Sequence, residues 1–212
     1  MDHEQRGIEA VMEAVGAPRD DLALIEADLE HPDAPRALIE RTVATFGGVD
    51  AVVAAHARSS DYTLEALSAE ELDRTFAINA RAGVLLVQAF ARLHDGARGG
   101  GRVVLFTSGQ HLAPMASEIP YAISKGAIHQ MTRTLADAVA DRGITVNAVN
   151  PGPVDTGWPG PELRQRLAGL FPAGRWGQPT DIAPVVAWLL SPESAWMTGE
   201  VLNVEGGFRR SP

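Results

Sequence analysis

Tyr121 and Lys125 are the two residues whose types and spacing most directly indicate acid/base chemistry. They lie four residues apart in a segment, 121–140, that is predicted as a helix, so their side chains share one helix face one turn apart. A free tyrosine has a pKa of roughly 10, and a cation within about 4–6 Å favours the phenolate. The pair therefore predicts a phenol that can exchange a proton with a substrate.

Lys125 is the only lysine among 18 basic residues, and the other 17 are arginines. Tyr-x-x-x-Lys alone is a weak pattern, because such pairs also occur on helix surfaces. A position that needed only a solvated charge would be expected to carry arginine like the others. Arginine substitutes poorly where a compact ammonium must reach two hydroxyls. The composition therefore favours a functional role for Lys125.

The elements that must position this pair alternate between helices and strands. The strands are mostly unbroken apolar runs, which is typical of a parallel sheet covered by helices on both faces. The sequence predicts an α/β fold, a doubly wound, Rossmann-like parallel sheet, with residues 1–212 as a single domain. Helices are expected at 1–16, 35–46, 68–93, 121–140 and 180–190, and strands at 22–27, 49–55, 102–108, 144–149 and 201–204.

Polar residues at the carboxyl ends of these strands mark the expected ligand site, because doubly wound sheets bind ligands there. Ser108 ends one strand, and its hydroxyl can donate to a carbonyl oxygen on which negative charge develops. Asp28, His56 and the turn Asn150-Pro151-Gly152 end three other strands.

Composition excludes several classes of protein. The net charge of −9 argues against a nucleic-acid binder, which needs a basic face. The chain has no cysteine, which excludes disulfides and thiolate sites, and no His/Asp/Glu cluster indicates a metal. The acidic start is not a signal peptide, and no stretch reaches the roughly 18 apolar residues of a membrane span. We expect a cytoplasmic protein without membrane contact.

Several motifs together resemble the short-chain dehydrogenase/reductase family, and within it the branch of the bacterial 3-oxoacyl-carrier-protein reductases. The resemblance extends over essentially all 212 residues. Ser108 precedes Tyr121 by 13 residues and Pro151 follows it by 30, as in the family. The motifs are Ala27-Asp28-Leu29, Phe76-Ala77-Ile78-Asn79, Thr107-Ser108-Gly109, Tyr121-Ala122-Ile123-Ser124-Lys125, Asn150-Pro151-Gly152-Pro153-Val154-Asp155-Thr156, Gly174 to Ala183, and Thr198 to Phe208.

The resemblance implies an NAD- or NADP-dependent oxidoreductase that interconverts a carbonyl and an alcohol on a small-molecule substrate. Tyr121 is then the acid/base, and Lys125 lowers its pKa and holds the cofactor ribose. Ser108 polarises the carbonyl, and Asn79 binds a relay water. The resemblance also implies a substrate lid at about 156–178 and a homodimer or homotetramer. The implied cofactor-binding residues are Asp28, Leu29, Ala55, Tyr121, Lys125, Pro151, Gly152, Val154 and Thr156.

Each of these residues also has a plain structural interpretation. Asn79 can be an ordinary polar residue on a packed helix, Ser108 a helix cap, and Asp28 a turn residue. The run Asn150–Pro153 is a strong turn signal whatever the function. His111, three residues after Ser108, is more simply a hydrogen-bonded or solvated histidine than a substrate contact.

The sequence departs from the family at two places. Ala54-Ala55-His56-Ala57 stands where the family has Asn-Asn-Ala-Gly, so Ala57 replaces a glycine that allows close approach to the cofactor. The family's opening strand, glycine-rich turn, helix and second strand are also not found. That unit of roughly 30 residues or more would cradle the cofactor pyrophosphate. Without it, the strand at 49–55 would have an unpaired apolar edge.

Three explanations of the second departure stay open. The gene start can be placed too far downstream, the segment can belong to the protein but not to this sequence, or the chain can be a short relative that pairs its edge with a partner. The first two are favoured, because the retained acid/base residues have little use in a chain that never bound a cofactor. The alternative function is a non-catalytic subunit that binds a complete family member through helices 68–93 and 121–140. The substrate and the choice between NAD and NADP are not indicated by the sequence.

Overall fold

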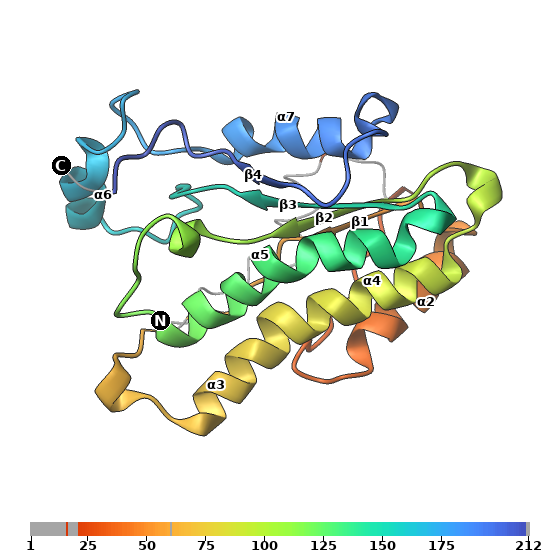
Figure 1. Cartoon of the computed structure of the whole chain (residues 1–212), viewed down its shortest axis with the longest axis horizontal. Helices are drawn as coiled ribbons and strands as arrows, with labels where there is room; N and C mark the ends of the chain where they lie inside the picture. The colour runs from red at the N-terminus through yellow and green to blue at the C-terminus, as the bar shows by residue number, and fades with distance from the viewer. Residues whose placement is uncertain (1–15, 17–20, 60, 211–212) are drawn as a thin grey trace.

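The structure is a computed structural model that describes residues 16, 21–59 and 61–210. In this part of the chain, one sheet of four parallel strands runs in the order β1-β2-β3-β4 (Figure 1). Because the strands are parallel, their carboxyl ends meet at one edge of the sheet. The α/β fold class predicted from the sequence is confirmed. The strands are β1 (Ala51–Ala54), β2 (Arg102–Phe106), β3 (Thr145–Asn150) and β4 (Val201–Asn203).

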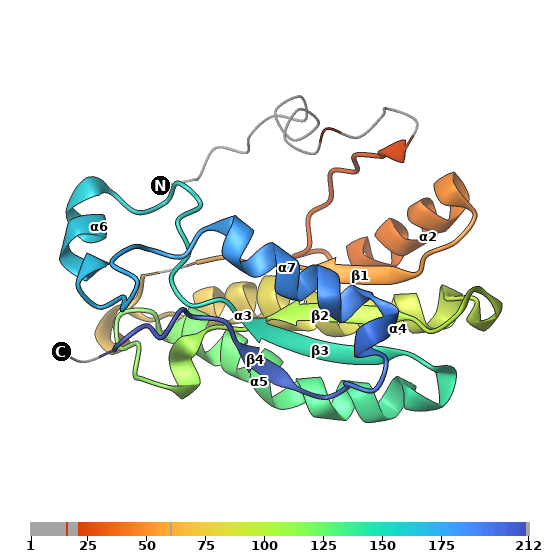
Figure 2. The same cartoon turned by 90° about the horizontal axis from the view of Figure 1, so that it is seen from above.

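Helices cover both faces of the sheet. α4 and α5 pack on one face, with α2 beside α4, and α7 crosses the opposite face (Figure 1, Figure 2). The helix α6 lies beyond the carboxyl ends of the strands (Figure 1). The α-helices are α2 (Ala34–Phe46), α3 (Ala69–Phe76), α4 (Ala82–Leu93), α5 (Ile119–Val139), α6 (Pro161–Ala168) and α7 (Pro179–Leu190). One-turn helices are η2 (Leu64–Ala66), η4 (Gly96–Arg98), η5 (Gly109–His111), η6 (Ala140–Arg142) and η7 (Pro192–Ser194).

The core consists of apolar strand residues packed between these two helical layers. Side chains alternate along a strand, so Val103 and Leu105 of β2 belong to the cluster under α4 and α5, whereas Val104 packs with α7. Phe90 of α4 is fully buried in the first cluster. Coverage of both faces explains why the strands are unbroken apolar runs in the sequence.

The helix predicted at 68–93 is present as α3, the π-helical turn η3 (Ala77–Arg81) and α4 in direct succession. The Ser68 hydroxyl caps it by accepting a hydrogen bond from Glu71 N at 3.2 Å. Against the sequence expectation, Ala69–Leu93 is long and apolar enough to cross a membrane by length and composition alone. Here 56% of its most apolar window is buried inside the fold, so it serves as a core helix. The π turn places Asn79 toward α5, and π turns often occur at functional sites.

Two predicted elements differ from the structure. The helix expected at 1–16 lies, apart from Gly16, outside the described residues. The strand expected at 22–27 is wrong, because these residues form no strand. A strand needs the N–H and C=O groups of a neighbour, and within the described residues β1 pairs with β2 alone. In this described part of the chain β1 is an edge strand, with Val53 42% exposed.

Candidate active site

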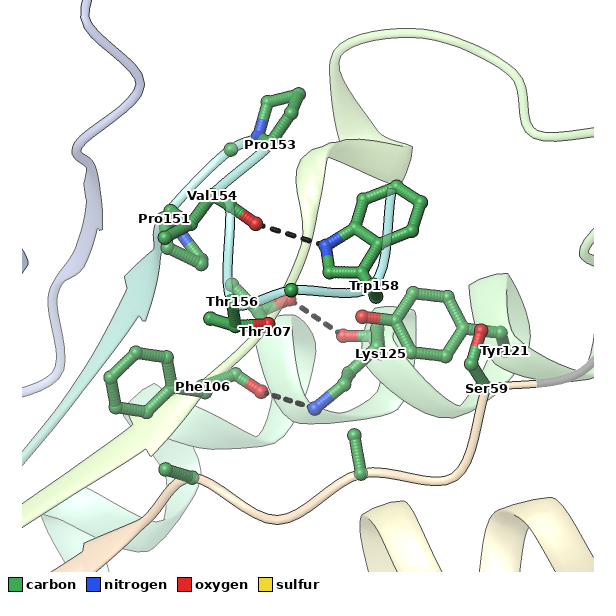
Figure 3. A pocket seen from close by; sticks show the side chains of 14 residues that line it. Ser59, Phe106, Thr107, Tyr121, Lys125, Pro151, Pro153, Val154, Thr156 and Trp158 are labelled. Carbon is green, nitrogen blue, oxygen red and sulfur yellow. Dashed lines mark hydrogen bonds between the residues drawn. The ribbon is translucent and has the colours of Figure 1, made fainter. Parts of the chain in front are cut away.

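A cavity of about 710 Å³ opens at the carboxyl ends of β1, β2 and β3 (Figure 3). Its walls come from the segments that follow these strands and from two residues of α5, at the edge where doubly wound sheets bind ligands. The lining residues are Ala55, Ala57, Ser59, Phe106, Thr107, Tyr121, Lys125, Pro151, Gly152, Pro153, Val154, Thr156, Gly157 and Trp158.

Tyr121 and Lys125 lie one turn apart near the start of α5, where Pro120 occupies the first helical turn. The Lys125 ammonium is 5.8 Å from the centre of the Tyr121 ring. Its Nζ donates a 2.8 Å hydrogen bond to the backbone carbonyl of Phe106 (Figure 3). The Thr107 hydroxyl donates to the backbone carbonyl of Lys125 at 2.8 Å. Two bonds to the end of β2 therefore hold the lysine against the cavity floor.

Burial dominates the ionisation of both residues. Burial, with a smaller contribution from the neighbouring Glu118 carboxylate, raises the pKa of Tyr121 to about 12, while a hydrogen bond with Ser108 acts in the opposite direction. Burial lowers the pKa of Lys125 to about 8. Lys125 is not among the groups that set this shift, so its effect on the tyrosine pKa, which the family resemblance implies, stays a prediction. The phenol is neutral near pH 7, which suits a proton donor.

Ser108 lies just past the end of β2, and its hydroxyl lies near the side chains of Gln110 and Tyr121. Ser108 occupies the N-cap position before η5, but its side chain makes no capping hydrogen bond, so the hydroxyl does not serve as a helix cap. Its hydroxyl is hydrogen-bonded with the Gln110 side-chain amide, and it is near enough to Tyr121 to lower the phenol's pKa through a hydrogen bond. Ser108 and Tyr121 can therefore meet one substrate oxygen.

Asn79 braces the loop after β1 against α5. It is 1% exposed. Its Oδ1 accepts from Arg58 N at 2.6 Å, and its Nδ2 donates to Arg58 O and to Ser124 Oγ, both at 2.9 Å. Both amide hydrogens are thus used by protein acceptors. In this structure the side chain positions the cavity wall, and the relay water implied by the family resemblance stays a prediction.

The predicted cofactor residues fall into two groups. Ala55, Tyr121, Lys125, Pro151, Gly152, Val154 and Thr156 all line the cavity. Asp28 and Leu29 do not, and the Asp28 carboxylate instead accepts a 2.9 Å hydrogen bond from Glu30 N in a turn. For Asp28 this agrees with the plain structural interpretation.

Sequence reasoning missed backbone and loop contributions to the cavity. The anchor of Lys125 is the backbone carbonyl of Phe106. Every residue has such a carbonyl, so residue type could not identify it. Thr107 belongs to the motif Thr107-Ser108-Gly109, so its place beside Ser108 could have identified it. Ser59 follows the strand at 49–55 and carries no distinguishing spacing.

Among the residues that the structure describes, no group of three or more His, Cys, Asp or Glu could hold a metal ion. His111 and His129 form a ring contact with centroids 4.4 Å apart, and His111 Nδ1 is 3.2 Å from the Ser108 carbonyl oxygen. His111 is therefore hydrogen-bonded, as its plain interpretation has it.

A mostly buried network of Asn150, Glu205 and Arg210 supports the turn after β3, which forms part of the cavity wall. Glu205 follows β4, and its side chain is 8% exposed. Its carboxylate accepts from Asn150 Nδ2 at 2.8 Å and is paired with the Arg210 guanidinium. Gly152 has φ +62°, and a Cβ there would lie 2.9 Å from Glu205 Cβ. The network therefore holds the turn after β3 in place through a residue that follows the next strand of the sheet.

We expect Glu205→Ala to lower the free energy of unfolding by about 2–4 kcal/mol, because the buried Asn150 amide loses one of its two acceptors and a mostly buried guanidinium loses its carboxylate. Urea unfolding followed by circular dichroism measures the change. Glu200→Ala is the matched control, since its pair with Arg133 is 3.6 Å long and both side chains are more than half exposed. Such a pair contributes about 0–1 kcal/mol. Equal losses in the two variants would contradict a structural role for the buried network.

Known proteins resemble this chain in sequence and in fold. A family model described as enoyl-(acyl carrier protein) reductase matches residues 1–209. An uncharacterized oxidoreductase of Bacillus subtilis (strain 168), YjdA, is 46% identical over 158 residues, which are 74% of this chain and 62% of that protein. The alignment thus spans less than two thirds of that relative's length.

Two solved structures share the fold at appreciable identity. A mutant short-chain dehydrogenase/reductase of Serratia marcescens is 32% identical with a TM-score of 0.84, covering 94% of this chain and 82% of that one. The angucycline C-6 ketoreductase LanV, solved with bound NADP, is 30% identical with a TM-score of 0.78, covering 86% of this chain and 74% of that one. The chain belongs to the short-chain dehydrogenase/reductase family of NAD(P)-dependent oxidoreductases.

Proposed function

We propose that this protein is an NAD(P)-dependent reductase that converts a small-molecule ketone to an alcohol, and the alcohol to the ketone in reverse, with Tyr121 as the acid/base. The observation that carries the proposal is the neutral Tyr121 phenol in a cavity that also presents Lys125, beside the Ser108 hydroxyl. The similarity to LanV, a ketoreductase with bound NADP, supports both the carbonyl substrate and the cofactor.

The residues at the cavity suit the nicotinamide–ribose half of such a cofactor. Lys125 offers an ammonium and Thr156 a hydroxyl at the same cavity, and both groups can bind ribose hydroxyls. Gly152 also lines the cavity, where it can contact a ligand only through its backbone. When bound, the cofactor supplies the hydride. The chain's own residues have to orient the carbonyl and move the proton.

The proton moves from Tyr121 to the substrate oxygen. As the carbonyl carbon is reduced, its oxygen becomes an alkoxide and takes the proton of the Tyr121 hydroxyl. The Ser108 hydroxyl stabilises the developing negative charge by donating a hydrogen bond. The Lys125 ammonium, 5.8 Å from the ring centre, stabilises the phenolate left behind. Oxidation of the alcohol follows the same path backwards, with the phenolate as base.

The experiment that tests this proposal combines cofactor binding with turnover. Titration of the purified protein with NADH and NADPH, followed by nicotinamide fluorescence, measures affinity. Nicotinamide oxidation with a varied panel of ketones, with the alcohol identified by mass spectrometry, measures catalysis. We expect ketone-dependent oxidation with one alcohol formed per cofactor consumed. Cofactor binding without conversion of any ketone would instead support the non-catalytic subunit.

The other expectations from the sequence are proposals too. We propose a homodimer or homotetramer in the cytoplasm that acts on small molecules and binds neither nucleic acid nor membranes. Multi-angle light scattering of the purified protein would measure the oligomeric state.

A further inference from the structure

Trp158 is the largest apolar side chain at the cavity, and the proton-transfer mechanism gives it no role. It lies four residues after Val154, in the segment that leaves β3, and it borders the cavity together with Tyr121. Figure 3 shows its indole on the same side of the cavity as the phenol. The residue is 45% exposed, so a large part of the ring system is free of protein contact.

The indole is held in place rather than loosely attached. Its Nε1 donates a 2.9 Å hydrogen bond to the Val154 carbonyl (Figure 3). The ring also makes an edge-on contact with Trp176, with centroids 5.7 Å apart and planes at 70°. Trp176 is itself buried and donates to the Arg164 carbonyl at 3.1 Å. A ring fixed in this way loses little conformational freedom when a ligand binds against it.

The polar needs of Trp158 are already met inside the protein. Its single N–H is used by Val154, so the remaining exposed surface offers only carbon atoms and a π face. Such a surface favours an apolar, flat ligand, and aromatic rings prefer offset or edge-to-face packing against it. The cavity lining at Ala57 and Ser59, outside the predicted cofactor-binding residues, carries small side chains, which leave room for a ring.

We propose that Trp158 is a specificity-determining residue that selects ketones fused or attached to an aromatic ring. The proposal rests on the proposed function, because the reacting carbonyl has to meet Tyr121. With the carbonyl oxygen at the phenol, the body of the substrate extends along the same side of the cavity toward the indole. Packing of a substrate ring on Trp158 then adds binding that a saturated ring of equal size does not receive.

A pair of bicyclic ketones tests this proposal. β-Tetralone and trans-β-decalone carry the ketone at the same position and differ in whether the second ring is aromatic. We expect the native protein to favour β-tetralone in kcat/KM by about three- to tenfold, the range that one aromatic pair contributes. In Trp158→Leu the ratio should fall toward one, and in Trp158→Phe most of it should return. Trp196→Leu, at a fully exposed position away from the cavity, should leave the ratio unchanged.

The outcomes separate this inference from the proposed function. An unchanged ratio in Trp158→Leu with turnover intact overturns the inference and leaves the reductase activity standing. An equal fall of kcat/KM for both ketones, together with a higher KM for the cofactor, also overturns the inference, because the indole then packs on the nicotinamide. If neither these two ketones nor any ketone of the wider panel is turned over, the proposed function fails, and titration calorimetry of both bicyclic ketones still tests the ring preference. Equal affinity for the two ketones in the native protein and in Trp158→Leu would overturn it there.

Discussion

Tyr121→Phe is expected to lower kcat for ketone reduction by about 10²–10⁴-fold, the contribution that general acid catalysis usually makes. The change removes one oxygen and keeps the ring that packs at the start of α5. The substrate oxygen then loses its phenol donor, because within the described lining of the cavity Tyr121 carries the only phenol. Stopped-flow or steady-state nicotinamide oxidation measures the loss.

The dissociation constant of the cofactor should change little in this variant. The ammonium of Lys125 and the hydroxyl of Thr156 remain, and these are the groups proposed to bind the ribose. Tyr62→Phe is the matched control, since Tyr62 is the other tyrosine of the chain and does not line the cavity. Full activity in Tyr121→Phe, or an equal loss in Tyr62→Phe, would refute the assigned acid.

The elements that the sequence predicted well are those whose pattern depends on local contacts. α5 was expected at 121–140 and spans Ile119–Val139, and its earlier start reflects the tolerance of a first helical turn for Pro120. The strand at 22–27 failed because strand formation depends on a neighbour rather than on the apolar run itself. Its apolar residues are half-buried at most and pair with nothing in the sheet.

The cavity could be predicted where residue type carried the signal. The single lysine of the chain pointed to Lys125, and a Pro-Gly turn pointed to the segment after β3. Contacts between residues that are far apart in the sequence could not be predicted. The Lys125 anchor is a backbone carbonyl, and Asn150 and Glu205 meet across 55 positions of sequence. The direction of the Tyr121 pKa shift also depends on burial, which spacing along a helix does not reveal.

Lys125→Met is expected to abolish most activity and yet to stabilise the protein near pH 7. Activity should fall by about a hundredfold or more, because the phenolate loses the neighbouring cation that stabilises it. Stability should rise because the lysine is 2% exposed and a buried ammonium is costly. A fall in its pKa from 10.5 to about 8 corresponds to about 3 kcal/mol at roughly 1.4 kcal/mol per unit. The Phe106 carbonyl loses its hydrogen-bond donor in this variant, which reduces the gain in the free energy of unfolding by about 1–2 kcal/mol.

The sign of the pH dependence distinguishes this explanation from simple repacking. Below about pH 8 the lysine is protonated in both the folded and the unfolded chain, so the full cost of the buried charge is present. Between about 8 and 10.5 the unfolded chain holds more protons than the folded one, and the stability of the native protein rises with pH. Urea unfolding of the native protein and of Lys125→Met should therefore differ most at neutral pH, and the advantage of the methionine should disappear as the pH approaches 10.5. Tyr121→Phe serves as the control, because it removes activity without removing the buried cation. A methionine variant that is less stable at neutral pH, or a difference that does not change with pH, would show that burial of the charge is not what lowers the stability of the native protein.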